Sequence, residues 1–153
     1  AGYLSNPSVG AAPLIEFNNN EYDDYNSKYI SSKVNTVCEI SKQRQVYLVR
    51  PYPRMQHKVP SYMLKAHALG NAAEYKVDKS HYLKYHDVAF RSQDLASIEC
   101  GAEIIDVTTE LCDETFCYGS ANLVPIYSDT NHLTENGSKL LIPLFKAIFK
   151  SDF

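Results

Sequence analysis

The strongest constraint on the fold of this sequence is the alternation of short apolar runs with longer segments of helical periodicity. The run at residues 46–49 is almost continuously apolar and rich in valine, which is typical of a buried strand in a parallel sheet. Pro51 and Pro53 end this strand, because a central strand does not tolerate proline. Residues 54–60 are therefore predicted to form a loop at the carboxyl end of a strand, where open α/β sheets bind ligands.

The other segments continue this alternation. Residues 1–12 are predicted to be a loop, because small residues, asparagine and proline predominate there. The patterns predict strands at 13–17 and 103–107, an extended stretch at 123–127, and helices at 23–42, 60–69, 80–98 and after Thr134, with a kink at Pro143. This order predicts an α/β fold in which helices cover both faces of a parallel sheet, with one domain over residues 1–153.

The composition excludes several classes of protein. The 153 residues are 44% hydrophobic and 22% charged, which fits one globular domain. The net charge is -3 and no basic stripe is present, so we expect no nucleic acid partner. The first residues do not resemble a signal peptide, and no apolar run approaches the ~20 residues of a membrane span. We therefore expect a soluble mature chain or a soluble domain of a larger protein.

The four cysteines are Cys38, Cys100, Cys112 and Cys117. They lack paired C-x-x-C spacing and a neighbouring histidine, so we expect no metal site, and we expect no cofactor. The short separation of Cys112 and Cys117 is typical of a disulfide that closes a hairpin in an oxidising compartment, but two free thiols fit the spacing equally well. For Cys38 and Cys100 we favour buried thiols over a second pair.

One histidine stands in a different context from the rest. His132 lies between the extended stretch and the last predicted helix, three residues after Asp129. In a non-helical turn this spacing can place the carboxylate beside the imidazole, which then acts as a general base for a serine hydroxyl. On spacing alone, a turn-forming aspartate beside a polar loop histidine is the simpler interpretation. His57 follows the strand at 46–49 and is a weaker candidate for contact with a substrate.

Three stretches in a fixed order carry a resemblance to a known family. They are residues 46–55 followed by Val59-Pro60, residues 105–112 followed by Cys117, and residues 125–134 followed by Gly137 and Leu140. Together they resemble the SGNH domain that is fused to bacterial acyltransferase-3 membrane proteins, within the SGNH/GDSL hydrolase superfamily. The third stretch, which contains Asp129 and His132, is the most diagnostic.

The resemblance implies a flavodoxin-like α/β/α sandwich with a parallel sheet and a Ser-His-Asp site, in which Asp129 orients His132. It also implies a disulfide between Cys112 and Cys117, in a periplasmic domain of a bacterial inner-membrane protein. The implied function is transfer of O-acetyl groups to a surface glycan, such as lipopolysaccharide O-antigen. The acyltransferase-3 membrane domain would deliver the acetyl group.

The sequence departs from the family at the nucleophile. It contains no Gly-Asp-Ser block, and no glycine can be assigned to the oxyanion hole. Asn18 follows the strand predicted at 13–17 and is the candidate oxyanion donor, with Asn19 as the alternative. Asparagines that only end the strand are an equal alternative. The sequence therefore resembles the C-terminal two-thirds of an SGNH domain, without the first strand.

Three accounts of this departure remain open. A companion N-terminal fragment produced by cleavage could carry the serine, the sequence could be truncated, or the chain could be a non-catalytic relative. With water as the acceptor, the same residues would make a carbohydrate O-acetylesterase. A non-catalytic SGNH-like module could instead hold a glycan in the loops at 51–57 and 129–132. In each case Tyr52, His57 and Tyr127 are the candidate substrate-binding residues.

Overall fold

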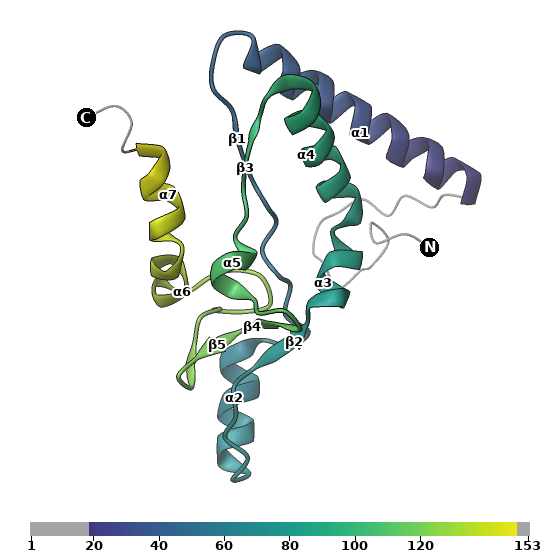
Figure 1. Ribbon diagram of the computed structural model, residues 1–153. Coiled ribbons are helices and arrows are strands. Elements are labelled where there is room, and N and C mark those ends of the chain that lie inside the picture. The colour runs from purple at the N-terminus through teal and green to yellow at the C-terminus, as the bar shows by residue number, and fades with distance from the viewer. Residues whose placement is uncertain (1–18, 150–153) are drawn as a thin grey trace. The chain divides into compact units, whose positions relative to one another are not determined.

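The computed structural model describes residues 19–149 and shows a mixture of helices and short strands (Figure 1). The helices are α1 (Asn19–Ser41), α2 (Val59–Ala68), α3 (Lys79–Tyr85), α4 (Asp87–Cys100), α5 (Thr108–Leu111), α6 (Glu135–Leu140) and α7 (Ile142–Phe149). The strands are β1 (Tyr47–Val49), β2 (Lys76–Asp78), β3 (Glu103–Ile105), β4 (Phe116–Tyr118), β5 (Ser120–Ala121) and β6 (Val124–Pro125). This mixture is compatible with the predicted α/β class. The loop and the strand expected before residue 18 lie outside the described residues.

The chain divides into two compact units. The first contains residues up to Leu48 together with Asp87–Ile104, and the second contains Val49–His86 and the residues from Ile105 onward. The backbone therefore leaves the first unit after Leu48, returns to it at Asp87 and leaves it again after Ile104. The expectation of one domain over residues 1–153 stays a prediction.

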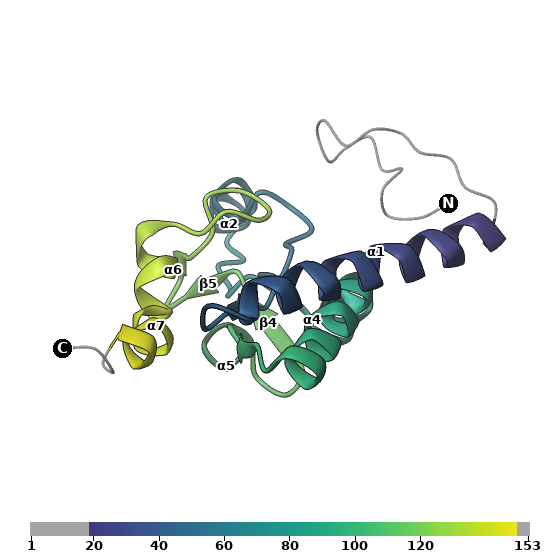
Figure 2. The same cartoon turned by 90° about the horizontal axis from the view of Figure 1, so that it is seen from above.

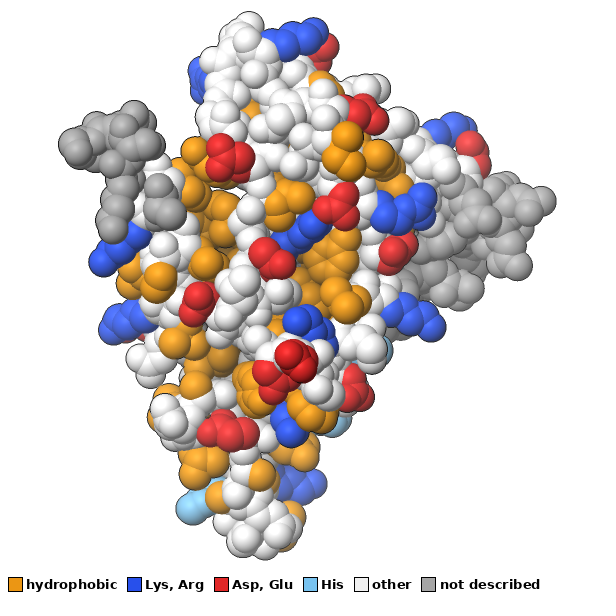
Figure 3. All heavy atoms as spheres, viewed as in Figure 1, with side chains coloured by type: hydrophobic (Ala, Val, Ile, Leu, Met, Phe, Trp, Pro, Cys, Tyr) orange, Lys and Arg blue, Asp and Glu red, His pale blue; other side chains and the backbone are white. Residues whose placement is uncertain are grey.

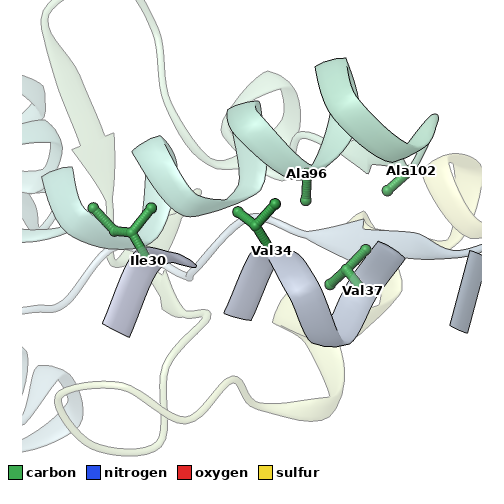
Figure 4. Close-up of a cluster of buried hydrophobic side chains, with 5 residues drawn as sticks. All are labelled: Ile30, Val34, Val37, Ala96 and Ala102. Carbon is green, nitrogen blue, oxygen red and sulfur yellow. The ribbon is translucent and has the colours of Figure 1, made fainter. Parts of the chain in front are cut away.

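The core of the first unit lies between α1 and α4, which run side by side (Figures 1 and 2). Ile30, Val34 and Val37 recur every three or four residues, which places them on one face of α1. Ala96 on α4 and Ala102 just after it face these branched side chains (Figure 4). The small alanine side chains let the two helices approach closely, so the apolar stripe is buried.

The same helix pairing brings together the first two cysteines. Cys38 and Cys100 form a disulfide, with their Cα atoms 4.9 Å apart. Our expectation of two buried thiols is therefore wrong. The reason lies in the packing, because the facing ends of α1 and α4 come within the separation that a disulfide needs.

The parallel pairing predicted from the apolar runs is present on a small scale, between β1 and β3. The Glu103 N–H donates to the Val46 carbonyl and the Arg50 N–H donates to the Ile105 carbonyl, each at 2.9 Å. Residue numbers rise together along the two strands, as they do in a parallel ladder. The larger α/β/α sandwich stays a prediction.

Two further strand pairs in the second unit are antiparallel. β2 pairs with β4, with Val77 opposite Cys117, and β5 pairs with β6 through a turn at Asn122 and Leu123. Both turn residues have positive φ, 52° and 61°, as a two-residue hairpin of this kind requires. The sequence did not predict β2, because its three residues include only one apolar side chain. Cys117 also forms an isolated antiparallel bridge and a disulfide with Cys112.

Two predicted helices are each divided in the structure. The helix expected at 80–98 separates at His86 into α3 and α4, and the last helix separates at Leu141 into α6 and α7. Pro143 was expected to kink the last helix, but it lies in the first turn of α7. A proline is tolerated there because its missing N–H would have no intrahelical partner.

The start of α6 is fixed against the end of β6. Thr134 is its N-cap, and the Thr134 Oγ1 accepts a hydrogen bond of 3.1 Å from the Gly137 N–H. A Cβ atom at Gly137 would lie only 2.1 Å from the carbonyl oxygen of Ile126. This contact requires glycine, and it anchors both ends of the intervening turn.

We predict that Gly137→Ala lowers the free energy of unfolding by about 1–3 kcal/mol, because the added methyl group must displace α6 or the Ile126 carbonyl. Chemical denaturation of the two proteins measures this difference. Ser138→Ala, at the next and exposed position of α6, is the matched control and should change stability by less than about 0.5 kcal/mol. Equal stability of the two variants would contradict the close contact.

We also predict that the non-reduced chain contains no free thiol, because both cysteine pairs are bonded. A thiol titration of the denatured protein should detect none before reduction and four after it. Replacing Cys38 and Cys100 by alanine should lower the free energy of unfolding by about 4 kcal/mol, from the entropy of a loop that spans 62 residues. Two reactive thiols before reduction would show that one of the bonds is absent.

Candidate functional site

The turn between β6 and α6 carries the two residues of greatest chemical interest. Its ends are held together, because Tyr127 and Leu133 form an isolated antiparallel bridge. The Ser128 N–H donates to the carbonyl of His132 at 2.8 Å, and the Ser128 hydroxyl donates to the same oxygen at 3.1 Å. The backbone on each side of Asp129 and His132 is therefore fixed.

The Asp129 carboxylate holds the turn and the imidazole at the same time. Its Oδ1 accepts the backbone N–H groups of Asn131 and His132, each at 2.8 Å. Its Oδ2 lies 2.6 Å from Nδ1 of His132. The Asn131 N–H, then the N–H and ring of His132, hold the pKa of Asp129 well below its ordinary value. The carboxylate is therefore ionised at neutral pH, and a proton on Nδ1 leaves Nε2 free to act as a base.

The imidazole of this pair is open to solvent. The side chain of His132 is 73% exposed, whereas that of Asp129 is 35% exposed. Ion pairs as exposed as this one contribute little to the free energy of unfolding. The contact between Asp129 and His132 therefore adds little stability beyond that of the turn. The orientation of an accessible imidazole by a fixed carboxylate is the arrangement that general base catalysis needs.

The loop that follows β1 lies against this turn. The Met55 N–H donates to the carbonyl of Thr130 at 2.7 Å, and the Val59 N–H donates to the carbonyl of Asp129 at 3.3 Å. Met55 and Val59 are fully buried, so their side chains anchor this loop in the interior. The structure therefore brings the predicted strand-end loop and the Asp-His turn together.

Two of the predicted substrate-binding residues lie in this loop and are accessible. Tyr52 is 37% exposed. His57 is exposed, its N–H donates to the Tyr75 hydroxyl at 2.9 Å, and its ring stacks on that of Tyr62 with centroids 5.5 Å apart. Both side chains are exposed in the loop, and their predicted contact with a substrate stays a prediction.

The third predicted substrate-binding residue is placed differently. Tyr127 is fully buried, and this burial raises the pKa of its hydroxyl. A fully buried ring cannot contact a ligand, so the prediction that Tyr127 binds the substrate is wrong. Tyr127 lies in the isolated bridge with Leu133, and its side chain is in the interior there. Asn18 lies outside the described residues, and its alternative, Asn19, is the first residue of α1.

Sequence reasoning missed the residue that supports His57. Tyr62 was not singled out. It lies four residues after Lys58, the N-cap of α2, and three residues before Lys65. That spacing was the available signal, because residues three and four apart share one face of a helix. Within residues 19–149, no group of histidine, cysteine or acidic side chains could hold a metal ion.

A second histidine near the loop, His86, is half-buried. His86 follows α3, and its ring contacts the edges or faces of Tyr82 and Tyr85. Burial lowers the pKa of His86 to about 4, against a hydrogen bond with the backbone of Tyr52 that raises it, while the charge of Arg54 lowers it further. With its pKa lowered in this way, the His86 imidazole is expected to be neutral at pH 7.

We predict that the folded chain loses stability as the pH falls from about 6.5 to about 4. In this window the unfolded chain binds a proton at His86 that the folded chain does not bind, so acid favours unfolding. His86→Phe should flatten this dependence, as measured by the melting temperature across the window. The matched control is His81→Phe on the exposed surface of α3, which should keep the wild-type slope. Equal slopes in all three proteins would contradict the burial of a neutral His86.

Comparison with protein families gives a match over nearly the whole chain. The model of the family described as "SGNH domain (fused to AT3 domains)" matches residues 2–147 of the chain. Searches of curated proteins and of solved structures give no significant match. No helix among residues 19–149 is both long and apolar enough to cross a membrane. Since the family match spans nearly the whole sequence and confirms the resemblance, the chain belongs to the family of SGNH domains that are fused to acyltransferase-3 domains.

Proposed function

We propose that this chain is part of a periplasmic SGNH domain that transfers O-acetyl groups to a surface carbohydrate, such as lipopolysaccharide O-antigen. Its family membership points to acyl transfer or ester hydrolysis on glycans. The observation that carries the proposal is the contact of 2.6 Å between Asp129 Oδ2 and His132 Nδ1. In this proposal the contact is the Asp-His half of a Ser-His-Asp site, and its exposed imidazole supports that role.

In this mechanism His132 moves the proton in both half-reactions. Asp129 keeps the proton on Nδ1, so Nε2 accepts the proton of a serine hydroxyl as the serine oxygen attacks the acetyl carbonyl. The donor's leaving group takes that proton, and the acetyl group remains on the serine. Nε2 then accepts the proton of a sugar hydroxyl, the sugar oxygen takes the acetyl group, and the serine recovers its proton.

The serine in this proposal comes from outside residues 1–153. The sequence contains no Gly-Asp-Ser block, so we assign the nucleophile and the oxyanion-hole glycine to another segment or to a companion fragment. That segment would also complete the α/β/α sandwich, with Asn18 as the remaining oxyanion donor. The acyltransferase-3 domain, which the family description places in the same proteins, would deliver the acetyl group across the inner membrane.

Two alternative functions each have an observation in their favour. The 73% exposure of His132 leaves Nε2 open to water, which favours a carbohydrate O-acetylesterase. The absence of a Gly-Asp-Ser block from the sequence favours a non-catalytic module that binds a glycan near Tyr52 and His57. The first differs from the proposal only in the acceptor, and the second differs in having no chemistry.

We predict that His132→Ala lowers the rate of acetyl transfer by about 10²- to 10⁴-fold in the full-length protein, because the general base is lost. Asp129→Asn should cause a similar loss, because an amide at this position favours the wrong tautomer of the imidazole. The rates are measured as acetyl groups appearing on a glycan extracted from the producing cells. In parallel, a fluorophosphonate probe should label a serine outside residues 1–153, and His132→Ala should abolish the labelling.

The matched control is His81→Ala, which changes an exposed histidine in the same unit and should keep full activity. Release of free acetate without acetylated glycan would replace the transferase with the esterase. If the full-length protein neither reacts with the probe nor moves acetyl groups, the catalytic proposal is wrong and the binding module remains.

A further inference from the structure

A groove runs along α2 in the second unit and is separate from the residues of the Asp-His turn. It encloses about 590 Å³. On the face shown in Figure 3, hydrophobic, basic and histidine side chains lie together over α2, at the bottom of the view. The polar residues that line the groove are His57, Lys58, Ser61, Tyr62, Lys65 and Glu74, together with Asn71.

The charge of the groove is positive. Within residues 19–149, neither Lys58 nor Lys65 forms an ion pair. The one carboxylate in the lining, Glu74, is already engaged, because its Oε1 accepts the Leu123 N–H at 2.8 Å and its Oε2 accepts the Ser120 hydroxyl. Two lysines against one hydrogen-bonded carboxylate leave an excess of positive charge for an anionic ligand.

An aromatic surface lies beside these charges. The rings of His57 and Tyr62 are stacked within 3° of parallel, and the ring of Tyr75 meets Tyr62 edge to face at 4.8 Å. Tyr62 remains 48% exposed. Rings that are fixed by their neighbours and still exposed provide an amphipathic surface at a low cost in conformational entropy. Such a surface suits a ring with both C–H and hydroxyl groups.

The groove begins next to the Asp-His turn. Lys58 directly precedes Val59, whose N–H donates to the Asp129 carbonyl at 3.3 Å. Lys65 lies two helical turns further along α2. A ligand that follows α2 from Lys58 to Lys65 therefore spans about 10 Å, at a rise of 1.5 Å per residue. This length corresponds to a short oligosaccharide.

We propose that this groove binds an acidic saccharide, with its anionic groups on Lys58 and Lys65 and a sugar ring against the His57–Tyr62 stack. As the acceptor subsite of the acetyl transfer it rests on the proposed function. As a binding site it rests on the groove alone. The chemistry of the lining favours carboxylated or phosphorylated sugars over neutral ones, because only an anionic ligand can form ion pairs with the two ammonium groups.

The test compares two double variants that each remove two positive charges. Lys58→Gln with Lys65→Gln removes both lysines of the groove. Lys28→Gln with Lys42→Gln removes two exposed lysines, one on α1 and one just after it, and is the matched control. Calorimetric titration with tetragalacturonic acid should give a dissociation constant at least 10-fold weaker for the groove variant, while the control matches the wild type. Tyr62→Ala should weaken binding about 5-fold or more, as expected for loss of the aromatic surface. Maltotetraose, the neutral probe, should bind at least 10-fold more weakly than the acidic one.

All titrations use the full-length protein with His132→Ala, so that binding is measured without turnover and its failure is distinct from failure of the catalytic proposal. Melting temperatures of the variants exclude unfolding as the cause of a loss. Equal loss in the two double variants, equal affinity for maltotetraose, or no binding of tetragalacturonic acid would each overturn the proposal. It is also overturned if phosphatidylglycerol vesicles bind through the same two lysines and the acidic sugar does not.

Discussion

The candidate site depends on one carboxylate that makes three hydrogen bonds. Oδ1 of Asp129 closes the backbone turn, and Oδ2 holds the His132 ring. The same bonds that shape the turn therefore determine the orientation of the imidazole. Since these bonds also keep the carboxylate ionised, the geometry and the electrostatics of the pair have a common origin.

Residues packed around the Asp-His turn hold its backbone within the second unit. Gly137 allows α6 to meet the Ile126 carbonyl directly, which fixes one end of the turn. The buried residues Met55 and Val59 bind the other side of it through their backbone N–H groups. Buried groups therefore hold the backbone of a turn whose His132 imidazole is exposed. The ring is accessible to solvent and still has a defined position.

Local patterns in the sequence were sufficient for the features that depend on neighbouring residues. The stripe of Ile30, Val34 and Val37 predicted α1, and the proline-bounded apolar run predicted β1. The contact between Asp129 and His132 could be anticipated because only two turn residues separate them and the family resemblance favoured the pair. Features that depend on distant parts of the chain were not predictable. The pairing of Cys38 with Cys100 needs the approach of two helices, and the burial of Tyr127 needs its bridge and neighbours. Strand β2 depends on its pairing with β4, because three residues with one apolar side chain are too few to predict a strand.

The bond between Cys38 and Cys100 also has a consequence for the connectivity of the molecule. The chain leaves the first unit after Leu48 and returns at Asp87, and this whole excursion lies between the two bonded cysteines. Residues 49–86, including α2 and its groove, are therefore part of a covalently closed ring. A peptide bond cut anywhere in this ring would yield two fragments that remain one molecule until a reductant separates them. Nicked and intact chains would have nearly the same mass, and only reduction would distinguish them.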